Sequence, residues 1–268
     1  MQEPKPTEKP TALKPAPIIA VIAVVLVVAI VGSLWAAIGT GSKPEDVPSK
    51  SDVVSTGSDV VESSGTVSSE IPALSQLTSV SKGDHFTLGN YPQGANGEVQ
   101  PIEWRVLDVQ NGRALVISEK LIDCVKYNEE YTSVTWETCT LRSWMNNDFL
   151  KQAFSSEQAK IVTVTNQNLD NPAHGTEGGN ATQDKIFVLS IDEANQYFIS
   201  DSDRKAYTTN YARKQRYGKG ADNWWLRSPG DDGFSAAIVY LDGSISQSGL
   251  FDVNNDVAVR PAFWLNLS

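Results

Sequence analysis

The stretch PIEWRVLDVQNGRALVIS, residues 101–118, decides the fold class, because it predicts two antiparallel strands joined by a tight turn. Apolar and polar residues alternate from Ile102 to Val106, which is the period of a half-buried strand. The dipeptide Asn111-Gly112 favours a hairpin turn, and the apolar run 114–117 supplies the second strand. We therefore expect an antiparallel sheet here.

Further hairpin and helix signals extend this prediction. Residues 238–241 and 244–246 flank Asp242-Gly243, a strong signal for a two-residue turn. Three helices are predicted where apolar residues recur at helical spacing or where a capping box begins a helix. Their markers are Leu141, Trp144, Met145 and Phe149; Ser155 with Gln158; and Ser190 with Glu193, which leads into Ala194, Tyr197 and Phe198. Many strands with a few grouped helices predict an α+β domain, mainly antiparallel, rather than a doubly wound parallel sheet.

The charge balance excludes one class of partner. The 268 residues include 32 acidic and 22 basic side chains, which gives a formal net charge of -10. A nucleic-acid binder needs a dense basic face to neutralise phosphates, so we expect no nucleic-acid partner. With only two His and two Cys, an ordinary zinc site is also not expected.

An uncharged apolar run at 18–38 predicts one transmembrane helix, since its length of about 31 Å matches a bilayer core. The alternative is a cleaved signal peptide with Ala37 and Gly39 near the cut, but the apolar run is too long for one. The lysine-bearing head at 1–17 indicates a cytoplasmic N-terminus. The bulk of the chain would then be extracellular, on a single-pass membrane protein.

The composition changes twice after this run. Residues 41–81 are rich in Ser and lack aromatic residues, which predicts a flexible stalk; a weak coiled coil through the Val pairs is the alternative. Residues 82–268 contain nearly all the aromatic residues and are long enough to bury a core. We therefore expect one extracellular globular domain there.

The usual catalytic motifs are missing from the sequence. There is no GxSxG elbow, HExxH pair, Walker loop or dinucleotide glycine fingerprint. His85 lies in a strand-like segment and His174 in a loop, where a lone His is usually a surface residue. Adjacent carboxylates such as Glu129-Glu130 and Asp231-Asp232 could support glycosidase-like chemistry, but they are more typical of solvated turns.

Metal and disulfide chemistry stay open. Two oxygen-rich runs could bind calcium, or could simply make turns, and neither matches an invariant calcium-loop spacing. They are Asn166, Asn168, Asp170 and Asn171; and Asp252, Asn254, Asn255 and Asp256. Cys124 and Cys139 could form a disulfide or remain as two buried thiols.

Eight motifs in the same order carry a resemblance to a known family. They are GNYPQ at 89–93, PIEWRVL at 101–107, DCVKYN at 123–128, TWETCTLRSWMN at 135–146, FLKQAFSSEQ at 149–158, TQDKIFVLSIDEA at 182–194, WWLRSPG at 224–230 and VRPAFWLNL at 259–267. The globular part resembles a bacterial domain of unknown function found in cell-surface and secreted proteins of Gram-positive bacteria. That domain is similar to C-type-lectin-like domains, which include formylglycine-generating enzymes. The resemblance implies a fold and a surface setting, and no established activity.

The comparison with lectin-like domains also directs attention to a site. The aromatic and arginine residues of WWLRSPG and VRPA are expected in core strands, with arginines tied to buried carbonyls or a carboxylate. Lectin-like domains place ligand loops among their last strands, which here is the interval Gly230–Asp256. Polar side chains around an aromatic residue suit a sugar or a protein loop. The candidate ligand-binding residues are Asp231, Asp232, Phe234, Asn254 and Asn255.

Two functions follow as hypotheses. The first is a membrane-anchored, non-catalytic recognition module that binds a glycan, a peptide or a cell-wall component, with calcium as a candidate cofactor. The alternative is an enzyme acting on cell-envelope material through carboxylates such as Asp184, Asp231 and Asp232. The calcium-and-sugar motif of true C-type lectins and the paired-cysteine site of formylglycine-generating enzymes are both missing, so oxidase activity is not expected.

Overall fold

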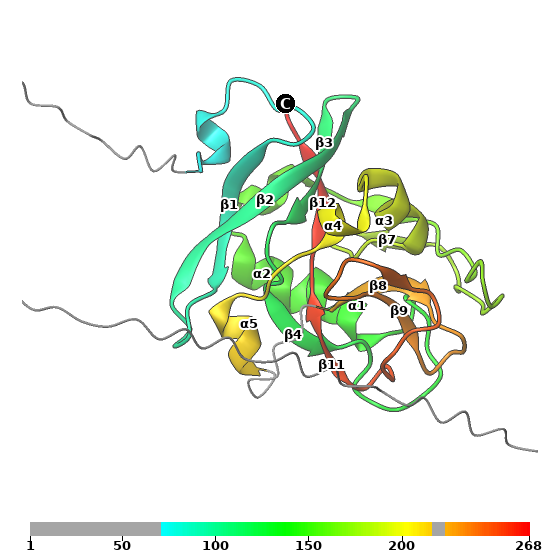
Figure 1. The fold of residues 1–268 in the computed structure, drawn as a ribbon. Coiled ribbons are helices and arrows are strands. Elements are labelled where there is room, and N and C mark those ends of the chain that lie inside the picture. Colours follow the sequence, from blue (N-terminus) through cyan, green and yellow to red (C-terminus); the bar gives the residue numbers. More distant parts are fainter. Residues whose placement is uncertain (1–70, 216–222) are drawn as a thin grey trace, which may run out of the picture. The chain divides into compact units, whose positions relative to one another are not determined.

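The computed structural model of the protein describes residues 71–215 and 223–268, which form two five-stranded sheets with short helices between their strands (Figure 1). The predicted head at 1–17, the predicted membrane helix at 18–38 and residues 41–70 of the predicted stalk lie outside these residues. In the described part of the chain, no helix has both the length and the apolar character that crossing a bilayer requires.

The predicted hairpin at 101–118 is confirmed. β2 (Val99–Gln110) and β3 (Arg113–Ser118) pair antiparallel on either side of Asn111-Gly112. Both turn residues have positive φ, 51° and 71°, which is the conformation that lets a two-residue turn match the twist of its strands. Local sequence therefore accounts for this part of the first sheet.

The first sheet has the order β1-β2-β3-β12-β5, and all its neighbours run antiparallel. The strands that join the hairpin are β1 (His85–Pro92), β5 (Ile161–Val162) and β12 (Ala262–Asn266). The last strand of the chain thus lies inside the sheet, where it pairs on both sides.

The second sheet has the order β10-β9-β8-β11-β4 and is antiparallel except between β8 and β11. Its strands are β4 (Asp123–Lys126), β8 (Trp224–Pro229), β9 (Ala236–Val239), β10 (Ile245–Ser246) and β11 (Asp256–Val259). A small separate sheet pairs β6 (Val164–Asn166) with β7 (Thr182–Asp184).

Short helices connect these strands. They are the 3-10 turns η1 (Leu74–Gln76) and η3 (Ser156–Lys160), the π-helical turn η2 (Met145–Phe149), and α1 (Thr140–Trp144), α2 (Leu150–Ala153), α3 (Ile191–Tyr197), α4 (Asp201–Arg204) and α5 (Asn210–Gln215). The helix predicted around Leu141 is confirmed as the continuous run α1–η2–α2. Mostly antiparallel sheets with short helices confirm the α+β class.

One of the two predicted capping boxes forms. At the start of α3, Glu193 N donates to Ser190 Oγ at 3.1 Å, and Ser190 N donates to Glu193 Oε2 at 3.0 Å. At Ser155 the prediction is wrong, because the nearer Glu157 carboxylate accepts both the Ser155 N–H and its hydroxyl, each at 2.9 Å. Gln158 instead donates to Phe154 O at 2.7 Å, and the segment is the 3-10 turn η3.

The predicted hairpin around Asp242-Gly243 is present, but its loop is longer than predicted. Gly243 N donates to Tyr240 O and Tyr240 N donates to Ser244 O, each at 2.8 Å, so three residues form the loop. Gly243 has φ 88°, the conformation of the bulge that follows a type I turn in such loops. Asp242 favours this form because its carboxylate accepts the Ser244 N–H at 3.0 Å.

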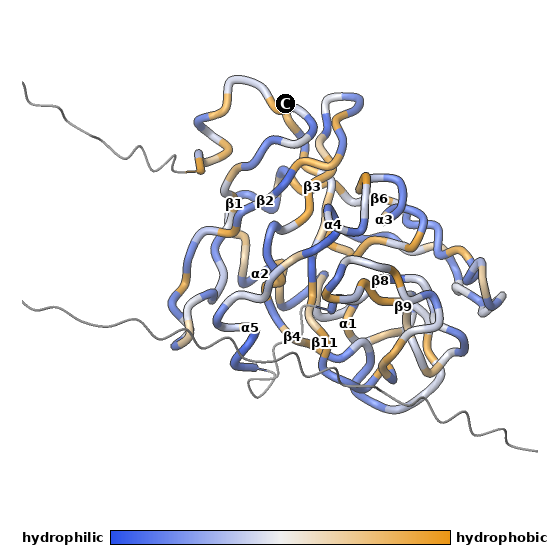
Figure 2. The backbone as a smooth tube through the Cα atoms, viewed as in Figure 1, coloured by the Kyte–Doolittle hydropathy of each residue, from blue (hydrophilic) through white to orange (hydrophobic). Residues whose placement is uncertain are grey.

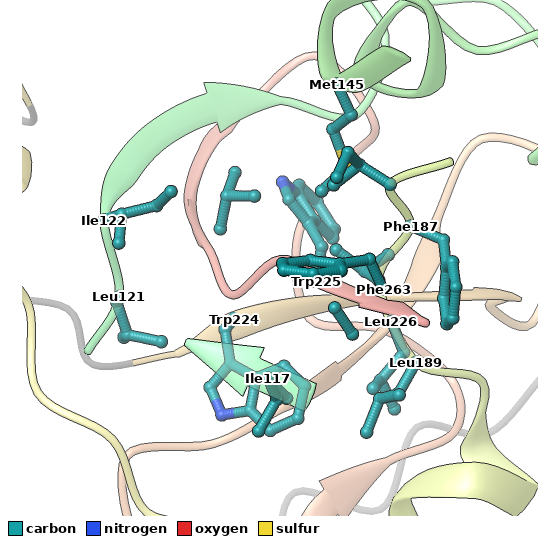
Figure 3. Packing of buried hydrophobic residues seen from close by; sticks show 14 of the residues in the cluster. Ile117, Leu121, Ile122, Met145, Phe187, Leu189, Trp224, Trp225, Leu226 and Phe263 are labelled. Atoms are coloured by element: carbon teal, nitrogen blue, oxygen red, sulfur yellow. The ribbon is translucent and has the colours of Figure 1, made fainter. Parts of the chain in front are cut away.

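The core lies around β8 and confirms the structural role expected for WWLRSPG. Figure 3 shows Trp224 and Trp225 on opposite sides of this strand, with Trp224 on the side of Ile117 and Trp225 on the side of Met145. All four of these residues are fully buried. Figure 2 shows apolar residues along the strands and hydrophilic residues on most connecting loops.

The arginine expected to meet a carboxylate does so. Arg227 of β8 is 4% exposed, and its guanidinium donates to both carboxylate oxygens of Glu193, with Nη2 at 2.7 Å from Oε1. Nη1 also donates to Val188 O at 3.1 Å. Because Glu193 caps α3 as well, this pair fixes α3 against the second sheet.

Residues 71–80 pack against the domain rather than ending a stalk. Thr87 N donates to Pro72 O at 2.9 Å, and Leu74, Leu77 and Val80 lie against the core. The packed domain therefore begins before Lys82, the boundary predicted from aromatic content. The side chains that contact the core here are aliphatic, so a domain boundary predicted from aromatic content starts too late in the chain.

Substitution of Trp225 by Ala should lower the free energy of unfolding by about 3–5 kcal/mol, because it leaves a large cavity in the core. It also leaves Val125 O without the donor that Trp225 Nε1 provides at 2.9 Å. Urea denaturation measures the effect, with Tyr207→Ala as the exposed control, for which a change within about 0.5 kcal/mol is expected. Equal stability of the two variants would contradict the assignment of Trp225 to the core.

Candidate functional site

The predicted site residues lie on two neighbouring loops, 230–235 between β8 and β9 and 247–255 between β10 and β11. Val253 N donates to Phe234 O at 2.8 Å, so the backbones of these loops are in contact. Asp231, Asp232, Phe234, Asn254 and Asn255 are exposed or half-buried. The structure thus brings all five to one region of the surface.

A third loop, 127–139 between β4 and α1, joins this region and was not predicted to do so. Val134 N donates to Gly233 O at 2.9 Å, and Asn128 N donates to Val253 O at 2.8 Å. The loop therefore contacts both of the others. We refer to 127–139, 230–235 and 247–255 together as the three surface loops.

An aromatic pair links two of these loops. Tyr131 and Phe234 have ring centroids 5.0 Å apart with planes inclined at 38°. Tyr131 is 56% exposed and Phe234 is half-buried, so the pair presents aromatic surface to solvent. A Tyr ring combines apolar contact area with a polar hydroxyl, which suits an interface.

The two predicted aspartates use one oxygen each to hold their turn. Ser235 Oγ donates to Asp231 Oδ1 at 2.9 Å, and Phe234 N donates to Asp232 Oδ1 at 2.8 Å. Among the described residues, neither Oδ2 has a hydrogen-bond partner. These outer oxygens are therefore available to a ligand while the inner ones keep the loop in place.

The two predicted asparagines belong to a tight turn. Asn255 N donates to Asp252 O at 2.9 Å, and Asn255 Nδ2 donates to the same oxygen at 3.2 Å. Asn254 precedes it and is half-buried. The Asn255 side chain thus stabilises the turn, which leaves Asn254 as the better candidate for ligand contact.

A buried asparagine supports the base of the loops. Asn171 is 1% exposed, and its Nδ2 lies 2.8 Å from Pro229 O, 3.0 Å from Gly230 O and 2.6 Å from Gln247 O. These carbonyls belong to the first residues of both loops or to the strand end before them. One amide group therefore sets the spacing between the loops at 230–235 and 247–255.

The side chains of the first candidate calcium run, residues 166–171, form hydrogen bonds within the protein. Asn171 Oδ1 accepts from Ala173 N, Asn166 Nδ2 donates to Asp184 Oδ2, and Asp170 Oδ1 accepts from Gly178 N. Across residues 71–215 and 223–268, no group of three or more His, Cys, Asp or Glu side chains could hold a metal ion. Asn and Asp in this run make turns and cross-links.

Asp184, proposed above for the enzyme alternative, is saturated with donors. Its side chain is 0% exposed, and Arg142 Nε donates to Oδ1 at 2.6 Å. Oδ2 accepts from Trp136 Nε1 at 3.0 Å, Asn166 Nδ2 at 2.8 Å and Thr182 Oγ1 at 2.6 Å. A carboxylate held in this way binds the loop at 127–139 and the small sheet to the core, and it presents no exposed surface.

Asp123 is a second buried carboxyl group, which sequence reasoning missed. Tyr91 Oη donates to Asp123 Oδ2 at 2.6 Å. Burial raises the pKa of Asp123, and the hydrogen bond from Tyr91 opposes this rise. The same burial raises the pKa of Tyr91. This pair lies between β1 and β4, so its position indicates a structural link.

The two cysteines do not form a disulfide. Cys139 is buried, and its Sγ lies 3.5 Å from Trp136 O. Burial raises the pKa of the Cys139 thiol to about 12, so the thiol stays protonated at neutral pH. This cysteine has the character of a core residue.

Two grooves of the described surface lie away from the three surface loops. One of about 520 Å³ is lined by residues such as Leu74, Gly89 and Lys160, and one of about 800 Å³ by Gln93 and Lys120 among others. His174 and Asp184 do not line either groove, and His174 is exposed.

Substitution of Asp184 by Ala should lower the free energy of unfolding by about 3–5 kcal/mol, because it leaves Arg142 and three polar donors without their acceptor. The matched variant Asp252→Ala removes an exposed carboxylate and should change stability by less than about 0.5 kcal/mol. Urea denaturation of the two variants tests this contrast. The opposite order of stabilities would exchange the roles assigned to the two carboxylates.

Comparison with known proteins gives one match, to the family described as Domain of unknown function (DUF6273), over residues 111–267. No curated protein and no solved structure matches the chain. The matched segment runs from the first hairpin turn to the end of β12, so it contains all three surface loops and more than half of the chain. The chain therefore belongs to this family, the Domain of unknown function (DUF6273).

Proposed function

We propose that the protein is a non-catalytic recognition module that binds a glycan, a peptide or a cell-wall component through its three surface loops. The observation that carries this proposal is the aromatic pair Tyr131–Phe234, in which the Tyr131 ring is 56% exposed and Phe234 follows the exposed carboxylates of Asp231 and Asp232 in the same loop. Asn171 fixes the spacing of the loops from below, so ligand contacts can be made without reorganising the core. Loops on a rigid scaffold are a common place for binding residues.

The chemistry of the buried groups supports binding over catalysis. Asp184 is buried and its two oxygens accept four hydrogen bonds, so it does not face solvent, and the Cys139 thiol is protonated. The pair Asp231-Asp232 is exposed to solvent, whereas catalytic carboxylates are commonly found in partly buried clefts. The enzyme hypothesis therefore lacks an observation in its favour.

The setting of the domain is also part of the proposal. An apolar run at 18–38 would anchor the chain as a single-pass protein, with the N-terminus in the cytoplasm and the domain outside the cell. A lectin-like arrangement is consistent with two mainly antiparallel sheets and with long loops between the last strands. Such an anchor would present the three surface loops to material in the cell envelope or beyond it.

A glycan array and a wall-hydrolysis assay on the full chain separate the two functions. We expect saturable binding to at least one glycan, peptide or wall fraction and no release of soluble wall fragments. Asparagine at Asp232, which keeps the Oδ1 acceptor of the Phe234 N–H, or alanine at Asn254 should weaken binding while changing stability by less than about 0.5 kcal/mol. Chelator is added in parallel, because a calcium-dependent ligand site would lose binding there. Hydrolysis that Asp231→Asn abolishes would instead support an enzyme.

The proposed topology is tested by adding protease to intact cells. Cleavage should release a fragment that begins within residues 41–70, because a Ser-rich segment of low apolar content is a preferred site of proteolysis. The segment at 18–38 should stay with the membrane fraction. A soluble protein in the medium that begins near Thr40 would indicate a cleaved signal peptide and refute the anchor.

A further inference from the structure

The three surface loops carry charge of one sign only. They contain no Lys or Arg, whereas five of their carboxylates are exposed. These are Glu129, Glu130, Asp231, Asp232 and Asp252. Lys126, just before the first loop, forms an ion pair with Glu129, with Nζ 3.2 Å from Oε2. The loops therefore form a negative rim.

Exposed apolar surface lies within this rim. Tyr131 is 56% exposed beside Phe234, and Leu250 on the loop at 247–255 is 57% exposed. An exposed aromatic face attracts cations as well as apolar groups, since its quadrupole presents negative charge above the ring. The carboxylates and the aromatic ring therefore both favour a cationic group on the ligand.

The arrangement of the three surface loops favours an extended ligand, because the loops come from three separate segments that meet through backbone hydrogen bonds. Small-molecule sites are usually concave and enclose most of the ligand. The grooves of about 520 Å³ and 800 Å³ are lined by other residues, among them Leu74, Gly89 and Gln93. A chain that lies across the loops can contact more of this face than a single sugar ring.

We propose that the three surface loops bind a basic peptide segment, in which an arginine stacks on Tyr131 and neighbouring cations meet Asp231 and Asp232. This assignment rests on the proposed recognition function and names its ligand class. Charge complementarity carries it, because every charged side chain on the loops is acidic. The unpartnered Oδ2 atoms of the two aspartates are the acceptors for the incoming guanidinium or ammonium groups.

The test measures binding of short, capped peptides to the full chain in detergent by fluorescence anisotropy. The probes are an alternating Arg-Gly peptide, the matching Glu-Gly peptide and a neutral chitin oligosaccharide. We expect binding of the Arg-Gly peptide alone. Raising the ionic strength from about 0.1 M to about 1 M should weaken it at least 10-fold, because the screening length falls from roughly 10 Å to roughly 3 Å.

Variants locate the contact. Asp231→Asn with Asp232→Asn should weaken binding about 5-fold, since each exposed ion pair contributes modestly. Tyr131→Leu keeps the apolar area but removes the aromatic face, and it should weaken binding about 3-fold. The control is Asp148→Asn with Asp192→Asn, which removes the same charge from the exposed helix surfaces of η2 and α3. This control should bind the peptide as the unmodified chain does.

The outcomes distinguish this inference from the function on which it rests. Equal weakening by the control double variant would mean that net charge, not the loops, attracts the peptide, and the inference would be overturned. Binding of the chitin oligosaccharide that Tyr131→Leu abolishes would overturn the basic-peptide assignment but support recognition at the loops. Failure of the Arg-Gly peptide to bind at all would overturn the assignment as well.

Discussion

The buried guanidinium of Arg260 is the interaction on which the arrangement of the two sheets depends. The residue lies between β11 of the second sheet and β12 of the first, and it is 0% exposed. Nε donates to Ser118 O at 2.9 Å, Nη1 donates to Arg204 O at 3.0 Å, and the Trp224 and Phe198 rings lie 5.3 Å away. Burial lowers the pKa of Arg260 to about 10, so the group remains charged at neutral pH. Backbone carbonyls and ring faces compensate for its lost hydration.

Sequence patterns predict those parts of the fold that depend on neighbouring residues. The Asn111-Gly112 turn and the Ser190–Glu193 capping box are confirmed because each involves residues within one turn. Asp242-Gly243 illustrates the limit, since the same dipeptide is compatible with both a two-residue and a three-residue loop. The order of the sheets is beyond such patterns, because β12 pairs with β3 and Arg260 reaches a carbonyl 142 positions earlier.

The candidate site was predictable only where one segment contains it. The composition of Gly230–Asp256 indicates exposed loops, and the structure brings its five candidate residues together on the surface. Tyr131 carries no local signal, because its role arises from contact with Phe234 on a distant segment. Asn171 was interpreted as a turn residue or calcium ligand, yet it supports two loops from the core. The roles of both residues depend on contacts with distant segments of the chain, and local sequence patterns do not predict such contacts.

Aspartate has different roles beneath the three surface loops and on their exposed face. Asp184 lies inside, where four donors balance the loss of water, and removal of any donor would leave an uncompensated polar group. Asp232 lies outside, where one oxygen shapes the turn and the other faces solvent. The inner carboxylate is therefore constrained by every donor that it accepts from, whereas the outer one is constrained only by the turn that it holds. Sequence variation in the three surface loops should accordingly cost less stability than variation in the buried network beneath them.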